Sequence, residues 1–208
     1  MLLFLILTLR AVAENVHHNP VLLVHGIKDD ERKMERMARY LRERGWQART
    51  MSYRPSFGQI GLDRLAEQVA ACVDANFAPG EKIDIVAFSM GGLVSRYYLQ
   101  RLGGAARVQR FVTISTPHHG TIVAWLLPNA GGRQMRPGSA FLRDLNANAD
   151  QLAKLDFTSF WTPFDLIILP ARSSIMPQAR NIRLGILLHP LMVWQTSCLL
   201  AVKDALSR

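Results

Sequence analysis

Short apolar runs alternate along the chain with longer segments in which apolar residues recur at helical spacing. The short runs predict strands over residues 21–24, 47–51, 83–88, 108–114, 157–161 and 182–188. The periodic segments predict helices over residues 34–41, 62–73, 93–98, 140–152 and 192–206. A run without polar residues, such as Val21-Leu22-Leu23-Val24, is typical of a strand that is buried on both faces. The alternation therefore predicts an α/β fold, with a mostly parallel central sheet and helices on both faces.

One long stretch, residues 115–140, lacks such a period and contains many glycines and prolines. Loops of this length inside a compact domain are usually functional. A stretch of about 25 residues is long enough for a flap but too short for a cap domain. We therefore expect a minimal lid.

The length of 208 residues suits one domain, which we assign to residues 19–208. Residues 1–18 are predicted to be an apolar extension or a signal-like segment. An apolar run over Met1–Leu9 precedes Ala11-Val12-Ala13, which is similar to a signal-peptide cleavage site. No lysine or arginine precedes this run, and it is shorter than most signal peptides. We expect a cytoplasmic protein, with export as the alternative if residues 1–13 act as a short signal peptide.

The composition narrows the classes of partner. The formal net charge is +9, and the basic residues are spread along the chain. Such a charge suits a solvated surface or attraction to anionic membranes, and no nucleic-acid recognition motif accompanies it. The two cysteines, Cys72 and Cys198, form no metal or disulfide signature and are expected to be buried free thiols. No metal-binding or phosphate-binding motif is present in the sequence, so we expect no cofactor.

The strongest chemical signal is the segment Ile83-Asp84-Ile85-Val86-Ala87-Phe88-Ser89-Met90-Gly91-Gly92. A strand, a serine in a tight turn and a helix follow one another, as a nucleophile elbow requires. The turn strains the serine backbone and lifts its hydroxyl above the sheet. Small residues two positions before and after, Ala87 and Gly91, let the strand and the helix pass closely. Ser89 is therefore the candidate nucleophile.

A second signal, His25-Gly26-Ile27, follows the first predicted strand. An oxyanion hole needs two backbone N–H groups, one from the residue after the nucleophile and one from an earlier strand–helix loop. Met90 and Ile27 fit these two places. His25 is expected to brace the loop, and Asp29 with Asp30 is expected to cap the next helix.

The segments Asn19–Ile27 and Ala87–Gly92 together resemble the small lipase/esterase group of the α/β hydrolases. Compact triacylglycerol lipases without a large lid are the best-known members of this group. The resemblance covers residues 19–207, and it is more specific at the elbow than in the C-terminal half. It implies a Ser–Asp–His triad in that chain order.

The resemblance places the acid of this triad at Asp165, just after the strand predicted over residues 157–161. Asp156 precedes that strand and would lie at the wrong end of the sheet. Asp144 and Asp150 fall in a predicted helix, and Asp84 lies inside the nucleophile strand, so these three are expected to be solvated or structural.

The histidine is expected after the last strand, where His189 stands before Pro190. The alternatives are His118 and His119, which also follow a strand. They precede every plausible acid, so the chain order would be wrong. We expect them to line or brace the pocket.

The sequence thus predicts a carboxylic ester hydrolase, either a lipase or an esterase, acting on a small-molecule or lipid ester with transient contact to lipid surfaces. Trp125, Leu126 and His119 are the candidate substrate-binding residues. Two alternatives remain open. One is an acyltransferase that forms the same acyl-enzyme, and the other is a non-catalytic binding module on a hydrolase scaffold.

Overall fold

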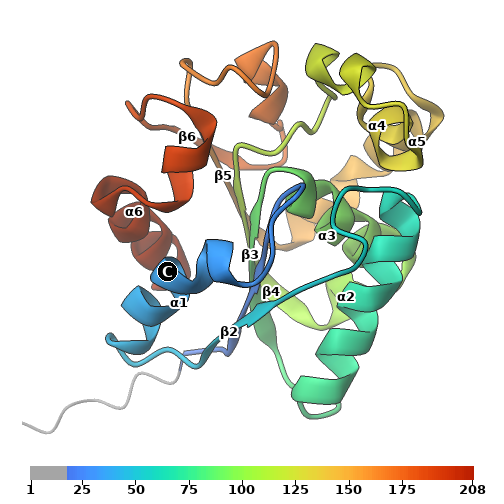
Figure 1. Ribbon diagram of the computed structural model, residues 1–208. Helices are drawn as coiled ribbons and strands as arrows, with labels where there is room; N and C mark the ends of the chain where they lie inside the picture. The colour runs from blue at the N-terminus through green and yellow to red at the C-terminus, as the bar shows by residue number, and fades with distance from the viewer. Residues whose placement is uncertain (1–17) are drawn as a thin grey trace, which may run out of the picture.

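A six-stranded sheet forms the centre of the computed structural model, which describes residues 18–208 (Figure 1). All neighbouring strands are parallel, as the sequence predicts. In spatial order the strands are β2 (Ala48–Met51), β1 (Val21–Val24), β3 (Ile83–Phe88), β4 (Val108–Ile114), β5 (Asp156–Trp161) and β6 (Arg180–Arg183).

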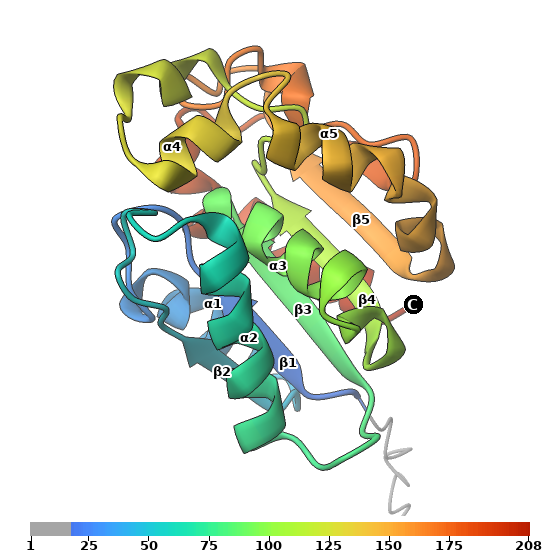
Figure 2. The same cartoon turned by 90° about the vertical axis from the view of Figure 1, so that its right-hand side faces the viewer.

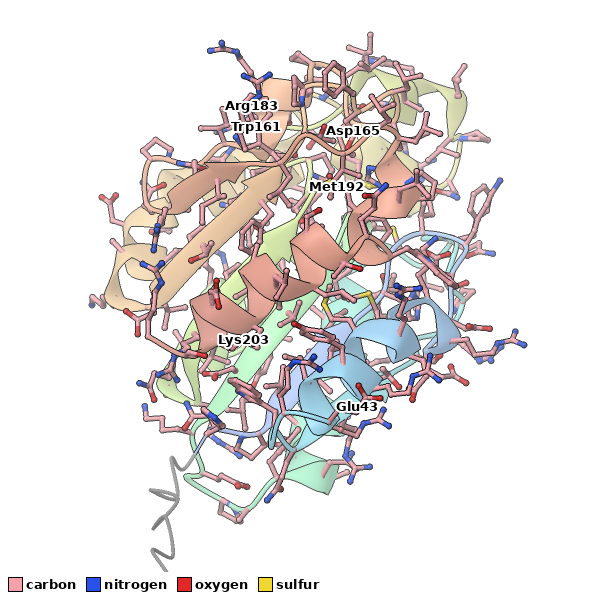
Figure 3. The ribbon with its side chains drawn as sticks, turned by 90° about the vertical axis from the view of Figure 1, so that its left-hand side faces the viewer. Glu43, Trp161, Asp165, Arg183, Met192 and Lys203 are labelled. Atoms are coloured by element: carbon pink, nitrogen blue, oxygen red, sulfur yellow. The ribbon has the colours of Figure 1, made fainter. Side chains whose placement is uncertain are left out.

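Helices cover both faces of the sheet. Helices α2 (Leu62–Asn76), α3 (Met90–Arg101) and α5 (Ala140–Ala147) lie over one face (Figure 2), and α1 (Arg32–Arg42) and α6 (Thr196–Leu206) lie over the other (Figures 1 and 3). Successive side chains of a strand point to opposite faces, so Leu22 and Val24 join one apolar core while Val21 and Leu23 join the other. The uninterrupted apolar strands thus supply two cores at once.

The last strand differs from its prediction. The strand predicted over residues 182–188 is wrong, because β6 ends at Arg183. Its neighbour in the sheet, β5, ends at Trp161, whose carbonyl accepts the Leu184 N–H at 2.8 Å. Beyond that bond no strand among residues 18–208 continues the pairing, and the chain leaves the sheet.

Two predicted helices are each divided in two. The helix predicted over residues 140–152 consists of α5 and the 3₁₀ helix η3 (Ala149–Lys154). At the break, the side chain of Gln100 donates hydrogen bonds to the carbonyls of Leu145 and Asn148, so these carbonyls are satisfied from outside the helix. The closing helix is likewise split into η5 (His189–Val193) and α6.

The predicted N-terminal extension lies outside the described residues except for His18, whose ring stacks on Trp46 at a centroid distance of 3.8 Å. Over residues 18–208 no helix has the length and apolar character needed to cross a membrane.

The irregular stretch after β4 contains two short helices, η2 (Ile122–Leu126) and α4 (Ala130–Met135). Two further 3₁₀ helices, η1 (Gly104–Ala106) and η4 (Ala171–Ser174), lie in other connections. With its short helices and loops, the stretch matches the minimal lid that the sequence predicts.

Helix α3 begins immediately after β3 and crosses β1 at close range. A Cβ atom at Gly91 would lie 2.3 Å from the carbonyl oxygen of His25 and 3.0 Å from that of Val24. A Cβ atom at Gly92 would lie 2.0 Å from the hydroxyl oxygen of Thr116. Only glycine fits at Gly91 without displacing the backbone of β1 and its following loop.

Gly91→Ala is therefore expected to lower the free energy of unfolding by about 1–3 kcal/mol, the usual cost of overpacking, as measured by urea denaturation. Gly185→Ala is the matched control, because a Cβ there meets no atom within 4 Å and the backbone φ is not positive. The control should change stability by less than about 0.5 kcal/mol. Equal effects of the two substitutions would contradict the close crossing.

Candidate active site

Ser89 occupies the sharp turn between β3 and α3, as the elbow pattern predicts. Its backbone has φ 54° and ψ −125°, a strained conformation for a residue with a side chain. The Ser89 N–H donates to the carbonyl of Ile114 at 2.8 Å, which anchors the turn to β4. The side chain is almost buried and borders a cavity. The fold thus holds a strained serine at the carboxyl end of the central strand.

The loop after β1 passes directly beside Ser89. A Cβ at Gly26 would lie 3.1 Å from the Cβ of Ser89, so a side chain there would press against the serine. Met90 is the first residue of α3, and its N–H has no acceptor within the helix. Ile27 lines the same cavity as Ser89, and Met90 follows Ser89 directly, so both candidate oxyanion residues lie near the serine.

His25 stabilises the loop after β1 through hydrogen bonds with Tyr53. The Tyr53 hydroxyl donates to the His25 carbonyl at 2.7 Å, and the Tyr53 N–H donates to His25 Nε2 at 3.4 Å. Burial lowers the pKa of His25, and the hydrogen bond to the Gly26 carbonyl acts in the opposite direction. A buried, neutral His25 suits the bracing role that the sequence predicts.

Asp165 and His189 form a hydrogen-bonded pair. His189 Nδ1 lies 2.7 Å from Asp165 Oδ2, and both side chains are almost completely buried. The other carboxylate oxygen, Oδ1, accepts the N–H groups of Ile167 and Ile168, each at 2.9 Å. Both oxygens of the acid therefore have fixed partners, and Figure 3 shows Asp165 at the upper end of the sheet.

The environment of Asp165 favours its ionised form. Burial alone would raise the pKa of this carboxyl group. The hydrogen bond and the charge of His189, together with the two backbone N–H groups, outweigh burial and lower the pKa below its usual value. Asp165 is thus an acceptor for the imidazole N–H across the neutral pH range.

Two local features orient the His189 side chain toward Asp165. The preceding residue, Leu188, has φ 70°, and Pro190 follows as the first turn of η5 begins. The Thr162 hydroxyl, in the loop that carries Asp165, donates to the carbonyl of Ile186 at 2.6 Å. The loop that carries Asp165 and the loop that carries His189 are therefore joined by a hydrogen bond.

A cavity of about 170 Å³ joins these elements. Ser89 and His189 both line it, and their neighbours around it are Ile27, Asp29, Lys33, Phe88, Ile167 and Pro190. The His189 ring also lies against the ring of Phe88, with centroids 4.8 Å apart. The nucleophile candidate and the base candidate thus face one space.

Asp29 and Lys33 are cavity residues that the sequence did not reveal. Burial raises the pKa of Asp29, and the positive charge of Lys33 opposes this rise. The sequence predicts that Asp29 and Asp30 cap the next helix; Asp30 accepts the Arg32 N–H at 3.0 Å, whereas Asp29 borders the cavity. Asp29 stands two residues after Ile27, and this short separation is the feature of the sequence that could have indicated its place at the cavity.

The structure does not bring the candidate substrate-binding residues into this cavity. Trp125 and Leu126 lie on η2 with 62% and 81% of their side chains exposed. His119 is exposed, and its Nε2 lies 3.1 Å from the Ile175 carbonyl. His118 is buried, with Nε2 at 3.1 Å from the Thr113 hydroxyl, and burial followed by the charge of Arg96 holds its pKa well below the usual value. Both histidines have structural partners.

A larger hollow of about 570 Å³ lies at the opposite edge of the sheet, where Pro20, Gln47 and Glu81 border it. Neither a serine nor a histidine is among the described residues that line it. Among the described residues no group of histidine, cysteine, aspartate and glutamate side chains could hold a metal ion. The smaller cavity is therefore the better candidate for a reaction site.

Comparison with known proteins identifies a family and the fold. Residues 20–164 match the family model of palmitoyl protein thioesterases. The mature form of a Bacillus licheniformis lipase matches with a TM-score of 0.74 and 17% identity, over 92% of this chain and 93% of that chain. Lipase B of Aspergillus fumigatus matches with a TM-score of 0.78 and 20% identity, over 92% of this chain and 52% of that chain. At such identities these structures establish the α/β-hydrolase fold, which confirms the predicted fold class.

Asp165→Asn is expected to lower the free energy of unfolding at neutral pH by about 1–3 kcal/mol, because a buried charge-assisted hydrogen bond is lost. The folded pKa of Asp165 lies below its unfolded value, so its stabilisation is present above about pH 4 and is lost as the pH falls through the folded pKa. Urea unfolding from about pH 2 to about pH 7 measures the difference from the wild type.

Asp156→Asn is the matched control, because Asp156 is exposed at the opposite end of β5. It should leave stability unchanged across the same pH range. A difference for Asp165→Asn that does not vary with pH would show that the carboxylate charge plays no part.

Proposed function

Since the chain belongs to the palmitoyl protein thioesterase family, we propose that it is a serine ester hydrolase, a lipase or esterase that forms an acyl-enzyme on Ser89. The 2.7 Å hydrogen bond between Asp165 and His189, beside a cavity shared with Ser89, carries this proposal. The family match ends at residue 164. The acid and the base are therefore assigned from their geometry and not from the family.

In the acylation step, the Ser89 hydroxyl oxygen attacks the carbonyl carbon of the ester while His189 Nε2 accepts the hydroxyl proton. Asp165 holds the imidazole in the tautomer that has its proton on Nδ1, and it stabilises the imidazolium that forms. The tetrahedral intermediate collapses as His189 returns its proton to the leaving alcohol oxygen. The acyl group remains bound to Ser89 as an ester.

In the deacylation step, His189 takes a proton from water, whose oxygen attacks the acyl carbonyl carbon. Collapse of the second intermediate releases the carboxylic acid and restores the Ser89 hydroxyl. In both steps the N–H groups of Ile27 and Met90 bind the oxyanion, each contributing about 3 kcal/mol to the transition state. The mechanism needs no cofactor.

The cavity suggests which part of a substrate the protein encloses. A volume of about 170 Å³ is smaller than the 300–1,000 Å³ of typical ligand pockets, so it accommodates the scissile group and only a few further atoms. A long acyl chain would have to leave the cavity across Ile167 and the neighbouring exposed apolar side chains. This arrangement fits lipid esters as well as small soluble ones.

Thioester hydrolysis is the second candidate activity, because the matching family model is that of palmitoyl protein thioesterases. The same triad cleaves both bonds, with a thiolate in place of an alkoxide as the leaving group. Both candidates are tested by measuring kcat/KM of the full chain on nitrophenyl esters and on acyl thioesters. The acyl groups of both series range from two to sixteen carbons. Added alcohol in the same assays tests the acyltransferase alternative through the appearance of a new ester.

Ser89→Ala is expected to lower ester hydrolysis by several orders of magnitude without loss of fold, because a triad fails when its nucleophile is removed. Activity against a nitrophenyl ester and the far-UV circular dichroism spectrum measure the two effects. Ser95→Ala is the matched control, since Ser95 is a buried serine on α3, the helix that follows Ser89, and does not line the cavity.

A serine-directed phosphonate should label Ser89 in the wild type and in Ser95→Ala, as peptide mass spectrometry would detect. Full activity of Ser89→Ala, or labelling at another residue, would remove Ser89 from the mechanism. Absence of all ester and thioester activity in a folded wild type would instead favour the non-catalytic binding module.

His189→Ala is expected to lose nearly all turnover and its reaction with the phosphonate, whereas His118→Ala and His119→Ala should retain turnover per folded molecule. The reason is that, of these three histidines, His189 alone contacts Asp165 and lines the cavity of Ser89. Because His118 is completely buried, its variant should lose thermal stability. The folded fraction must therefore be measured beside the rate.

The comparison of the three histidine variants decides between the candidate bases. Substantial turnover in His189→Ala, together with inactivity of a folded His118 or His119 variant, would show that the chain order Ser–Asp–His does not hold here.

A further inference from the structure

Large apolar side chains are exposed on three segments at the carboxyl edge of the sheet. These segments are residues 122–126, 164–167 and 187–194, and we call their exposed apolar side chains the apolar collar. Leu126 is 81% exposed, Leu166 64%, Trp125 62% and Leu187 60%. A monomeric protein rarely exposes so many large apolar residues close together unless they bind something.

Hydrogen bonds fasten the three segments into one surface. The Ile122 N–H donates to the Leu169 carbonyl at 2.9 Å, and the Thr121 hydroxyl donates to the Ile167 carbonyl at 2.7 Å. The bond from Thr162 to the Ile186 carbonyl joins the second segment to the third. Figure 1 shows all three above the carboxyl ends of the strands. Ile167 belongs both to the collar and to the cavity of Ser89, so the surface borders that cavity.

The charged side chains on the loops that carry the collar are almost all positive. The loops that carry it, residues 115–139, 162–179 and 183–195, contain four arginines, Arg133, Arg136, Arg172 and Arg183. Their single carboxylate, Asp165, is buried against His189. Figure 3 shows Arg183 at the same upper end of the molecule as Asp165. An exposed surface with arginines and no exposed carboxylate on its loops suits an anionic partner.

Trp125 and Arg136 combine the two properties of this surface. The guanidinium of Arg136 lies 4.3 Å from the centroid of the exposed Trp125 ring. Tryptophan places an apolar body and a polar edge at a lipid–water boundary, and arginine keeps its charge at the headgroup level while its stem contacts apolar groups.

From these observations we infer that the apolar collar docks onto the surface of an anionic lipid bilayer, with the cavity of Ser89 facing the lipid. Apolar side chains enter the interface while the arginines contact anionic headgroups. A second copy of this chain would bring the same arginines against one another, so charge disfavours self-association through this face. The inference does not depend on the proposed catalytic activity.

Vesicle binding by the full chain with Ser89→Ala, which cannot turn over lipid by the proposed route, tests the inference. Vesicles of phosphatidylcholine alone are compared with vesicles in which about a third of the lipid is phosphatidylglycerol, and bound protein is measured by sedimentation. Binding should be at least about tenfold stronger to the anionic vesicles and should weaken at high salt.

Leu126→Ser and Arg172→Ser should each weaken binding to the anionic vesicles several-fold. The matched controls are Leu200→Ser, which changes an exposed leucine on α6, and Lys154→Ser, which removes an exposed charge beside the amino end of β5. Both controls should bind like the parent. Thermal unfolding of every variant verifies that it is folded.

Three results would overturn the inference. One is the absence of binding to anionic vesicles, and another is equal binding to both kinds of vesicle. The third is a concentration-dependent dimer in gel filtration that Leu126→Ser abolishes, because a second copy would then cover the collar.

Discussion

The contact between the start of α3 and the carbonyl groups of β1 fixes the geometry of the whole carboxyl edge. A helix that begins one residue after a central strand must cross the neighbouring strand, and Gly91 allows it to do so within touching distance. At the turn into this helix Ser89 has its strained backbone conformation, and it lies beside the loop that carries Ile27. Packing between one glycine and one strand thus accompanies the placement of Ser89 beside the loop that carries Ile27.

Around this rigid centre, the other side of the candidate site is assembled from loops. Asp165 and His189 lie on connections after β5 and β6, the two strands at one edge of the sheet. Residues on loops are less constrained in position than residues on strands, so further hydrogen bonds must hold them in place. Asp165 accepts hydrogen bonds from two backbone N–H groups, and Thr162 donates one to the Ile186 carbonyl. These bonds stabilise the two loops.

The sequence predicted the parts of this structure that local patterns control. Strands such as Val21–Val24 and Ile83–Phe88 contain long apolar runs because both of their faces are buried, and the elbow at Ser89 has a local signature. The strand predicted over residues 182–188 was wrong because its true extent depends on where β5 ends, which lies more than 20 positions earlier. The broken helix after Ala140 depends on side chains of α3, and no local period records them.

The candidate site shows the same division. Motifs predicted Ser89, Ile27 and Met90. Asp29 and Lys33 also border the cavity, and their place there depends on the conformation of the loop after β1. Trp125 and Leu126 are apolar and follow a strand, which is all that the sequence reveals. Their exposure on η2, outside the cavity, results from tertiary packing.

The two outermost strands, β2 and β6, are only four residues long, and both contain arginine. An exposed sheet edge offers unpaired backbone groups to any other extended chain, and a long apolar edge invites aggregation. Short edges that contain arginine give an incoming strand little to pair with and repel copies of this basic chain. The end of β6 at Arg183 therefore also protects the protein from aggregation. This protection matters because the molecule exposes many apolar side chains at one end, and a sheet edge that could pair with further strands would add to its tendency to associate.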